Sequence, residues 1–301
     1  MGRGRRARPR SAALREDKRR TFLRYSLQSA MQQFSLLTTL ALISVPLAAM
    51  VSAEPSSVRF ITVLNDCPFT IWPAFFTASG PQPIQPPGWE AKPNTGLTFA
   101  TATNWSGRIW GRRVCDFSTG STGPDTCLSG GCNGGLICNT TTGTGVPPAT
   151  LATIDFSGTS KDIYTVSVVD GYNLPMAFVN NGGCSFASCP VDLATSCPED
   201  LAGPFDRDGQ PVGCKSACLR DALAGNAGNS SNCCTGAFGS QAACPTSGVE
   251  HYNYFKQSCP DSFAYAFDEP SGTAIFQCPK AVKFDEDVEY TVTFCPDPFN
   301  L

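Results

Sequence analysis

Four segments of the chain carry the pattern of β-strands. Residues 58–64 (VRFITVL) are β-branched and aromatic, and residues 288–294 (VEYTVTF) alternate apolar and polar side chains with a period of two. Residues 163–169 and 273–277 are further candidates, because clusters of Gly, Pro, Asp or Ser that favour turns flank each of them. We therefore expect strands near both ends of the main domain and others between them.

Helical patterns are short and confined to the later middle of the chain. Residues 217–224 place Leu219 and Leu223 four positions apart, and residues 249–257 carry apolar side chains at helical spacing before Pro260. The simplest architecture is a β-rich body that is interrupted by a cysteine-dense, partly helical insertion.

The first 53 residues have the composition of a secretion signal. Residues 1–30 hold ten basic side chains, and the 18 residues 34–51 are largely apolar. Small residues precede position 54, so we expect cleavage after Ala53; Met31 is a possible true start that would leave a signal of ordinary length. The alternative is an uncleaved anchor, because the apolar run is at the lower limit of what spans a bilayer. Either route places the cysteines outside the cytosol.

Loss of this leader changes the charge of the protein. The leader holds 10 Lys and Arg against 2 Asp and Glu, which leaves 12 against 23 in residues 54–301 and a formal charge of about −11. A domain this acidic is not expected to bind nucleic acid. It is also poorly suited to attraction by anionic bilayers.

The 16 cysteines all lie between Cys67 and Cys295. An even number at this density in an exported chain indicates a disulfide framework. Cys233 and Cys234 are adjacent and need different partners, but spacing alone does not choose among the many complete pairings. Zinc is the alternative, and it is disfavoured because paired C-x2-C knuckles are missing and the single histidine, His251, lies outside the cluster. We expect no metal and no cofactor.

Three triplets fit the acceptor pattern for N-glycosylation, which an exported chain can undergo. They begin at Asn104, Asn139 and Asn229. Because chance produces such triplets often, these asparagines are candidates only.

Six short blocks of sequence stand out beside the cysteines. They are NDCPFTIWP at 65–73, WGR at 110–112, PPATLA at 147–152, VDGYNLPM at 169–176, FK at 255–256 and TFCP at 293–296. Together they resemble the thaumatin-like proteins, the pathogenesis-related family 5. The resemblance extends over nearly all of residues 57–296, and the cysteines follow the family's order, including the adjacent pair.

The resemblance implies a mainly β fold. Its parts are a flattened β-sandwich or barrel core, a disulfide-rich, partly helical lobe and a small looped lobe. In this chain the core would comprise residues 54–112, 147–190 and 261–301, the looped lobe 113–146 and the helical lobe 191–260.

The resemblance also implies eight disulfides, paired by the order of the cysteines in the family. The pairs are Cys67–Cys295, Cys115–Cys127, Cys132–Cys138, Cys184–Cys278, Cys189–Cys259, Cys197–Cys214, Cys218–Cys233 and Cys234–Cys244. In this arrangement the adjacent cysteines have different partners, and the first pair ties the two terminal strands.

Many members of the family have an acidic cleft between the core and the helical lobe, and some bind or hydrolyse β-1,3-glucan. The resemblance assigns this cleft to Arg108, Thr153, Thr165, Asp170 and, less directly, Asp192. Thr153 and Thr165 stand where the family usually has Glu and Asp. Hydrolysis ordinarily needs a carboxylic acid and a carboxylate about 5 to 9.5 Å apart, and a threonine hydroxyl cannot act as a general acid near neutral pH.

Asp155 is the candidate to replace a missing acid. It lies two residues after Thr153, so on a strand both side chains would share a face about 7 Å apart. The alternative, which the frequency of Asp at turn starts favours, is that Asp155 opens a turn at residues 155–158. Asp162 has the opposite parity to Thr165 and is expected to point away from the cleft.

We therefore predict an exported, monomeric defence or cell-wall-associated protein that binds carbohydrate, with β-1,3-glucan as the expected ligand, and lacks strong catalysis. Arg108 would donate hydrogen bonds to sugar hydroxyls, and Asp170 and Asp192 would accept them. A weak endo-β-1,3-glucanase is the first alternative, with Asp170 and Asp155 as catalytic candidates. A membrane-perturbing antifungal protein or a protease-resistant interaction module is the second. We expect no stable membrane insertion after signal cleavage.

Overall fold

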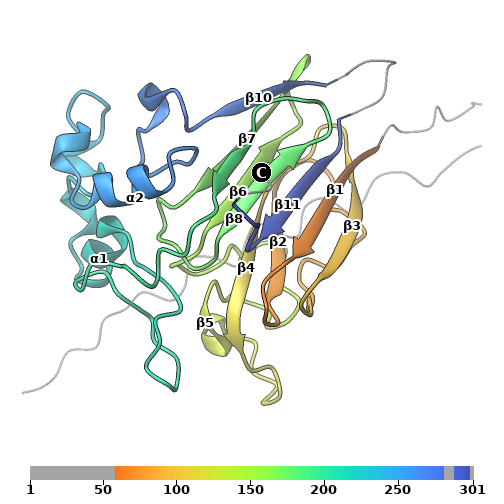
Figure 1. Ribbon diagram of the computed structural model, residues 1–301, viewed down its shortest axis with the longest axis horizontal. Helices are drawn as coiled ribbons and strands as arrows, with labels where there is room; N and C mark the ends of the chain where they lie inside the picture. The colour runs from red at the N-terminus through yellow and green to blue at the C-terminus, as the bar shows by residue number, and fades with distance from the viewer. Residues whose placement is uncertain (1–57, 281–287, 299–301) are drawn as a thin grey trace, which may run out of the picture. The chain divides into compact units, whose positions relative to one another are not determined.

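Residues 58–280 and 288–298 are described by the structure, a computed structural model, and they all belong to one unit of the chain, Ala53–Leu301. They form two β-sheets beside a region of short helices (Figure 1). The predicted leader, its cleavage site and Met31 lie outside the described residues. Within these ranges, none of the helices has the length and apolar character that crossing a bilayer requires.

The first sheet brings the two ends of the domain together. Its strands lie in the order β3 (Thr95–Ala102), β1 (Val58–Asn65), β11 (Tyr290–Phe294), β8 (Met176–Asn180) and β9 (Ala187–Cys189). β1 and β11 pair in parallel, and the other neighbours are antiparallel. The two predicted terminal strands are confirmed, the second beginning two residues later than predicted.

The second sheet is antiparallel and carries the middle of the chain. Its strands lie in the order β10 (Phe276–Pro279), β7 (Lys161–Ser167), β6 (Leu151–Asp155), β4 (Ser106–Cys115) and β2 (Trp72–Ser79), and β5 (Cys127–Ser129) pairs with β4. The strand predicted at 163–169 is β7, displaced by two residues. The strand predicted at 273–277 overlaps β10 only at its end, because pairing with β7 begins at Phe276. The hydroxyl of Thr273 donates instead to the carbonyl of Pro260.

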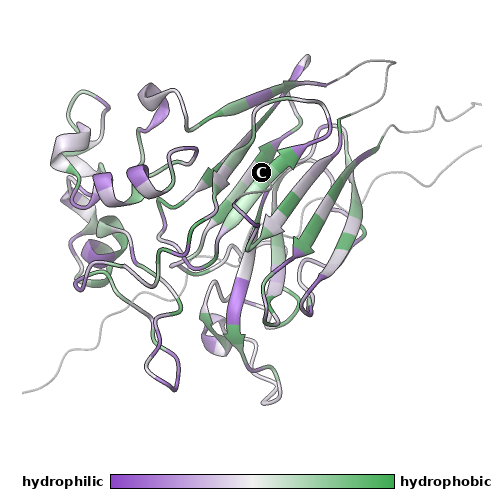
Figure 2. Cartoon of the chain, in the orientation of Figure 1, coloured by the Kyte–Doolittle hydropathy of each residue, from purple (hydrophilic) through white to green (hydrophobic). Residues whose placement is uncertain are grey.

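The inward faces of the two sheets meet in an apolar core. Figure 2 shows green apolar bands separated by paler or purple ones along the strands, as alternation requires. Ile61 and Val63 of the first sheet belong to the same buried cluster as Ile109, Ile154 and Val166 of the second. Burial of these alternate positions leaves the intervening side chains on the outward faces.

A charged pair is buried between the sheets. Arg59 of β1 and Asp162 of β7 are 1% and 0% exposed, and their Nη2 and Oδ2 atoms are 2.6 Å apart. The Tyr290 hydroxyl donates to the same carboxylate oxygen at 3.0 Å, and Arg59 also donates to the carbonyl of Val288 at 2.8 Å. The prediction that Asp162 points away from the face of Thr165 is therefore confirmed.

Residues 113–146 cover one end of the outward face of the second sheet. Trp110 and Leu151 pack there against the Cys132–Cys138 disulfide. Arg112 ties this segment to β2, because it donates hydrogen bonds to the carbonyls of Gly135 and Leu136 in the segment and to those of Trp72 and Pro73 in β2. Its burial lowers the pKa of the guanidinium to about 10.

The helical region contains α1 (Ala217–Leu223) and α2 (Tyr252–Ser258). Ser216 caps α1 by accepting a hydrogen bond from the backbone N–H of Leu219. Both predicted helices are confirmed, but α2 begins three residues late because His251 has a left-handed backbone (φ 58°) and a 3₁₀ turn precedes it. The 3₁₀ helices in the described part of the chain are Pro124–Thr126, Ala227–Asn229, Gly236–Phe238, Thr246–Gly248 and Glu269–Ser271.

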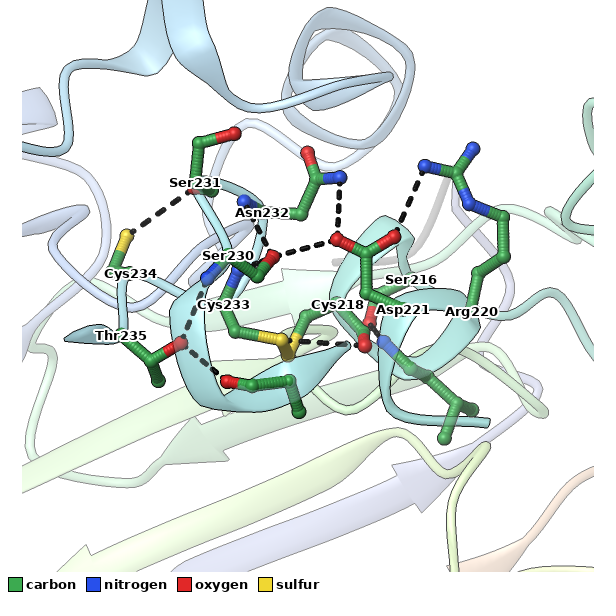
Figure 3. Close-up of a disulfide and its surroundings, with 12 residues drawn as sticks. Ser216, Cys218, Arg220, Asp221, Ser230, Ser231, Asn232, Cys233, Cys234 and Thr235 are labelled. Carbon is green, nitrogen blue, oxygen red and sulfur yellow. Dashed lines mark hydrogen bonds and ion pairs between the residues drawn. A yellow bond between two sulfur atoms is a disulfide. The ribbon is translucent and has the colours of Figure 1, made fainter. Parts of the chain in front are cut away.

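A carboxylate on α1 ties the cysteine-rich loops to that helix. Figure 3 shows Asp221 accepting hydrogen bonds from the Ser230 hydroxyl at 2.6 Å and the Asn232 amide at 3.0 Å, next to the Cys218–Cys233 disulfide. Burial alone would raise the pKa of Asp221, but these hydrogen bonds and the one from Arg220 hold it below its ordinary value.

All sixteen cysteines lie within the described residues, and none of them is free. The structure contains the same eight pairs that the family resemblance implies, and the adjacent cysteines bond to Cys218 and Cys244. The Cys67–Cys295 pair, 228 residues apart in sequence, joins the residues that follow β1 and β11. It closes nearly the whole described domain into one covalent loop.

We predict that Asp162→Asn or Arg59→Met lowers the free energy of unfolding by about 3–5 kcal/mol, because either change leaves an uncompensated polar or charged group in the core. Urea unfolding at pH 7 under non-reducing conditions measures the loss. The double variant Arg59→Met with Asp162→Leu should recover most of it. Single variants as stable as the unmodified protein would show that the pair does not hold the sheets together.

Candidate functional site

The register of the second sheet places three of the predicted cleft residues in one row. Arg108 of β4 lies opposite Thr153 of β6, and Thr153 lies opposite Thr165 of β7. Their neighbours Ile109 and Ile154 are buried in the core, so alternation directs the row to the outward face, where all three side chains are half-buried. A guanidinium and two hydroxyls are thus presented side by side.

The row lies between a covered and an uncovered part of the same face. On one side Trp110 and Leu151 form the next row, beneath the looped segment. On the other side Ser106, Asp155 and Ile163 are in register and lie away from that segment. The looped segment therefore bounds the polar region at one edge.

Asp155 shares the face of Thr153, as the period of a strand requires. Its Oδ1 atom accepts a hydrogen bond of 2.8 Å from the backbone N–H of Ser157. This bond supports the interpretation of Asp155 as the residue that opens the turn after β6. One of its two carboxylate oxygens is therefore engaged in local structure.

Asp170 lies in the turn between β7 and β8, next to Tyr172, which pairs with Cys214 of the helical region. Gly171 has φ +88°, and a Cβ atom there would lie 2.8 Å from Pro148 Cβ and 2.9 Å from the carbonyl oxygen of Cys214, so only glycine fits. Tyr172 then exchanges two backbone hydrogen bonds of 2.8 Å with Cys214. Asp170 is thereby held, exposed, where the second sheet meets the helical region.

The electrostatics of Asp170 link it to the row. Although Asp170 is exposed as a residue, nearby protein atoms partly displace water from its carboxylate and raise the pKa of Asp170 above its ordinary value, while the positive charge of Arg108 acts in the opposite direction. Arg108 is therefore close enough to interact with Asp170. The structure brings Arg108, Thr153, Thr165 and Asp170 into one polar region.

Asp192 interacts with a different arginine. Its Oδ1 atom accepts hydrogen bonds from the backbone N–H of Ala194 at 2.9 Å and from the Tyr172 hydroxyl at 3.4 Å. Burial lowers the pKa of Arg113, and the charge of Asp192 opposes that shift. Burial and the neighbouring Asp192 also raise the pKa of Tyr172 well above its ordinary value. Asp192 therefore belongs to a Tyr172–Arg113 neighbourhood, whereas Asp170 lies in the field of Arg108.

The model of the protein family described as "Thaumatin family" matches residues 65–296. The chain belongs to this family. Pathogenesis-related thaumatin-like protein 3.5 of Cryptomeria japonica is 37% identical over 238 residues, which are 78% of this chain and 89% of the relative. Thaumatin-like protein 1 of Arabidopsis thaliana is 39% identical over 248 residues, 78% and 85% of the two chains. A glucan endo-1,3-beta-glucosidase of Prunus avium is 34% identical over 242 residues, 78% and 90%.

One carboxylate near this site of the thaumatin-family chain was not singled out from the sequence. Phe263 forms a parallel bridge with Ser167 at the end of β7, and Asp261 lies two residues before it. Asp261 is half-buried, whereas Ser262 beside it is completely buried. The position directly after a Cys-Pro block was the available signal. Asp261 is therefore a second acid near the end of β7, the strand that the Asp170 turn follows.

Three side chains in the helical region meet the geometric requirement for a metal site within the described ranges. One ligand atom from each of Asp200, Glu250 and His251 lies within 4.8 Å of the others. Arg220 already pairs with Asp200 at 2.5 Å and with Glu250 at 2.6 Å. A cation would have to displace this guanidinium, so the group is better explained as an ion-pair network.

We predict that Asp170→Asn does not destabilise the protein at pH 7. The carboxyl group protonates more readily in the folded than in the unfolded state, so it favours folding in acid. That advantage is lost as the pH rises from the ordinary pKa of 3.8 through the raised pKa of Asp170 in the folded protein. Urea midpoints of Asp170→Asn and the unmodified protein between pH 3 and pH 7, in about one-unit steps, test this. A lower midpoint for the variant at pH 7 would contradict it.

Proposed function

We propose that the protein is an exported defence or cell-wall-associated protein that binds β-1,3-glucan at the polar region of Arg108, Thr153, Thr165 and Asp170. The observation that carries this proposal is the row of Arg108, Thr153 and Thr165 on one outward face, with Asp170 in the field of the arginine. These groups can donate to and accept from the hydroxyls of a neutral sugar. A relative named for endo-1,3-β-glucosidase activity supports the choice of glucan.

Binding is favoured over hydrolysis because the row itself supplies no acid. Both of its family-type acid positions are threonines, and a hydroxyl cannot protonate a leaving oxygen near neutral pH. Asp155, the candidate replacement, uses one oxygen for the turn to Ser157. A weak endo-β-1,3-glucanase that uses Asp170 with Asp155 is the second candidate, because Asp155 does share the face of Thr153.

Export and a monomeric state are part of the same proposal. The signal-like leader supports export. The acidic charge of residues 54–301 argues against perturbation of anionic membranes. Asn104, Asn139 and Asn229 are exposed, as N-glycosylation requires, and remain candidates for it. Asn139 and Asn229 accept backbone hydrogen bonds through their Oδ1 atoms, which leaves the Nδ2 atoms available.

We expect Arg108→Gln and Asp170→Asn each to weaken retention on insoluble β-1,3-glucan by about tenfold or more, because each removes a charged hydrogen-bonding group. Depletion from solution by a series of glucan concentrations measures the affinity. Asp66→Asn is the matched control, since Asp66 is an exposed acid that follows β1 of the other sheet. Equal retention of all three variants and the unmodified protein would refute this site.

We also expect no release of reducing sugar from laminarin beyond that of heat-inactivated protein. Two carboxylates at a suitable distance are needed for the ordinary hydrolytic route. The row supplies none, Asp155 uses one oxygen in its turn, and Asp170 and Asp261 lie outside the row. Colorimetric assay over a long incubation with the intact exported protein makes the measurement. Release that disappears in Asp155→Asn, and persists in Asp66→Asn, would establish the glucanase alternative instead.

A further inference from the structure

A separate hollow lies at the edge of the first sheet. It has a volume of about 280 Å³ and is lined by the segment from Trp89 to Lys92 together with Thr95, Gly96 and Leu97. These residues include the start of β3, the edge strand of that sheet. None of Arg108, Thr153, Thr165 and Asp170 lines this hollow, so it is not part of the site described above.

The walls of the hollow are fixed by the fold. The backbone N–H of Trp89 donates to the carbonyl of Pro73 at 3.1 Å, and Ala91 exchanges two backbone hydrogen bonds with Ile71. The indole ring contacts Phe99 edge to face, with ring centroids 6.4 Å apart. On the other side the Thr95 hydroxyl donates to the carbonyl of Lys92 at 2.7 Å. The hollow is therefore already formed without a ligand.

Three polar groups at this hollow have no partner within the described residues. Trp105 and Trp110 donate their indole N–H groups to Thr77 and to the Gly130 carbonyl, whereas the half-buried Trp89 makes no such bond in the described part of the chain. The carboxylate of Glu90 and the ammonium of Lys92 are likewise exposed and make no ion pair there. Two donor groups and one acceptor thus belong to residues that line the hollow.

We propose that this hollow binds one pyranose ring of a neutral oligosaccharide. The opposite charges of Glu90 and Lys92 cancel, so the hollow does not favour an anion or a cation. An indole ring offers an apolar surface to the C–H face of a sugar, while its N–H group, the ammonium and the carboxylate can bond hydroxyls. The volume of about 280 Å³ is near the lower limit of ligand sites, which suits a single ring.

This second site does not depend on the Arg108 region. The two surfaces share no residue, although one wall of the hollow is hydrogen-bonded to Pro73 at the start of β2 in the second sheet. If both are occupied, one protein can hold two glucan segments, and the apparent affinity for an insoluble polymer exceeds that for a short oligosaccharide. A sugar bound only at the hollow would leave the proposed function of the other region untested but would establish this inference by itself.

Indole N–H resonances in a ¹H–¹⁵N spectrum test the proposal, because the chain has 4 tryptophans and the Trp89 signal is identified by its loss in Trp89→Phe. Titration with laminaritriose should shift the Trp89 resonance to saturation and leave those of buried Trp105 and Trp110 in place. The shift should persist in Asp170→Asn. A Trp89 resonance that does not respond to laminaritriose, cellotriose or xylotriose would overturn the proposal.

Variants separate binding from folding. Trp89→Phe keeps an aromatic ring against Phe99 and should weaken laminaritriose binding about two- to tenfold, the range expected for one lost hydrogen bond. Glu90→Gln should act in the same direction without touching the core, since Glu90 is exposed. Calorimetric titration measures both, with Asp208→Asn as the matched control, because Asp208 is an exposed acid that does not line the hollow. Unchanged affinity in both hollow variants would contradict the assignment.

Discussion

The ion pair of Arg59 with Asp162 joins the two sheets at their interface. Both side chains must point inward together, because a buried charge without its partner would be strongly destabilising. On β7 this requirement sets the parity of the whole strand, since successive side chains alternate between faces. Thr165, three residues after Asp162, is thereby held on the outward face beside Thr153. The polar region outside depends on a charge that is satisfied inside.

Much of this arrangement can be inferred from local pattern. The alternation at 288–294 predicts β11 because a half-buried strand is the structure that separates two kinds of side chain at a period of two. The parity argument for Asp162 succeeds for the same reason. Family resemblance, which no local pattern replaces, was needed for the disulfide partners and for the residues of the cleft.

Other features depend on contacts between distant segments. The start of α2 is displaced because His251 adopts a left-handed backbone, and an apolar spacing does not reveal that conformation. The surroundings of Asp192 depend on Tyr172 and Arg113, which come from other parts of the chain. The row of Arg108 with the two threonines likewise requires the register of three strands, which the sequence of one strand does not contain.

The Cys67–Cys295 bond has a consequence for the fate of the protein in a compartment that contains proteases. Any single peptide-bond cleavage between these two residues leaves both fragments attached through the bridge, so the nicked molecule keeps its mass apart from one added water. The seven other bridges restrain the loops on either side of such a cut. Damage of this kind becomes visible only after reduction, when the pieces separate.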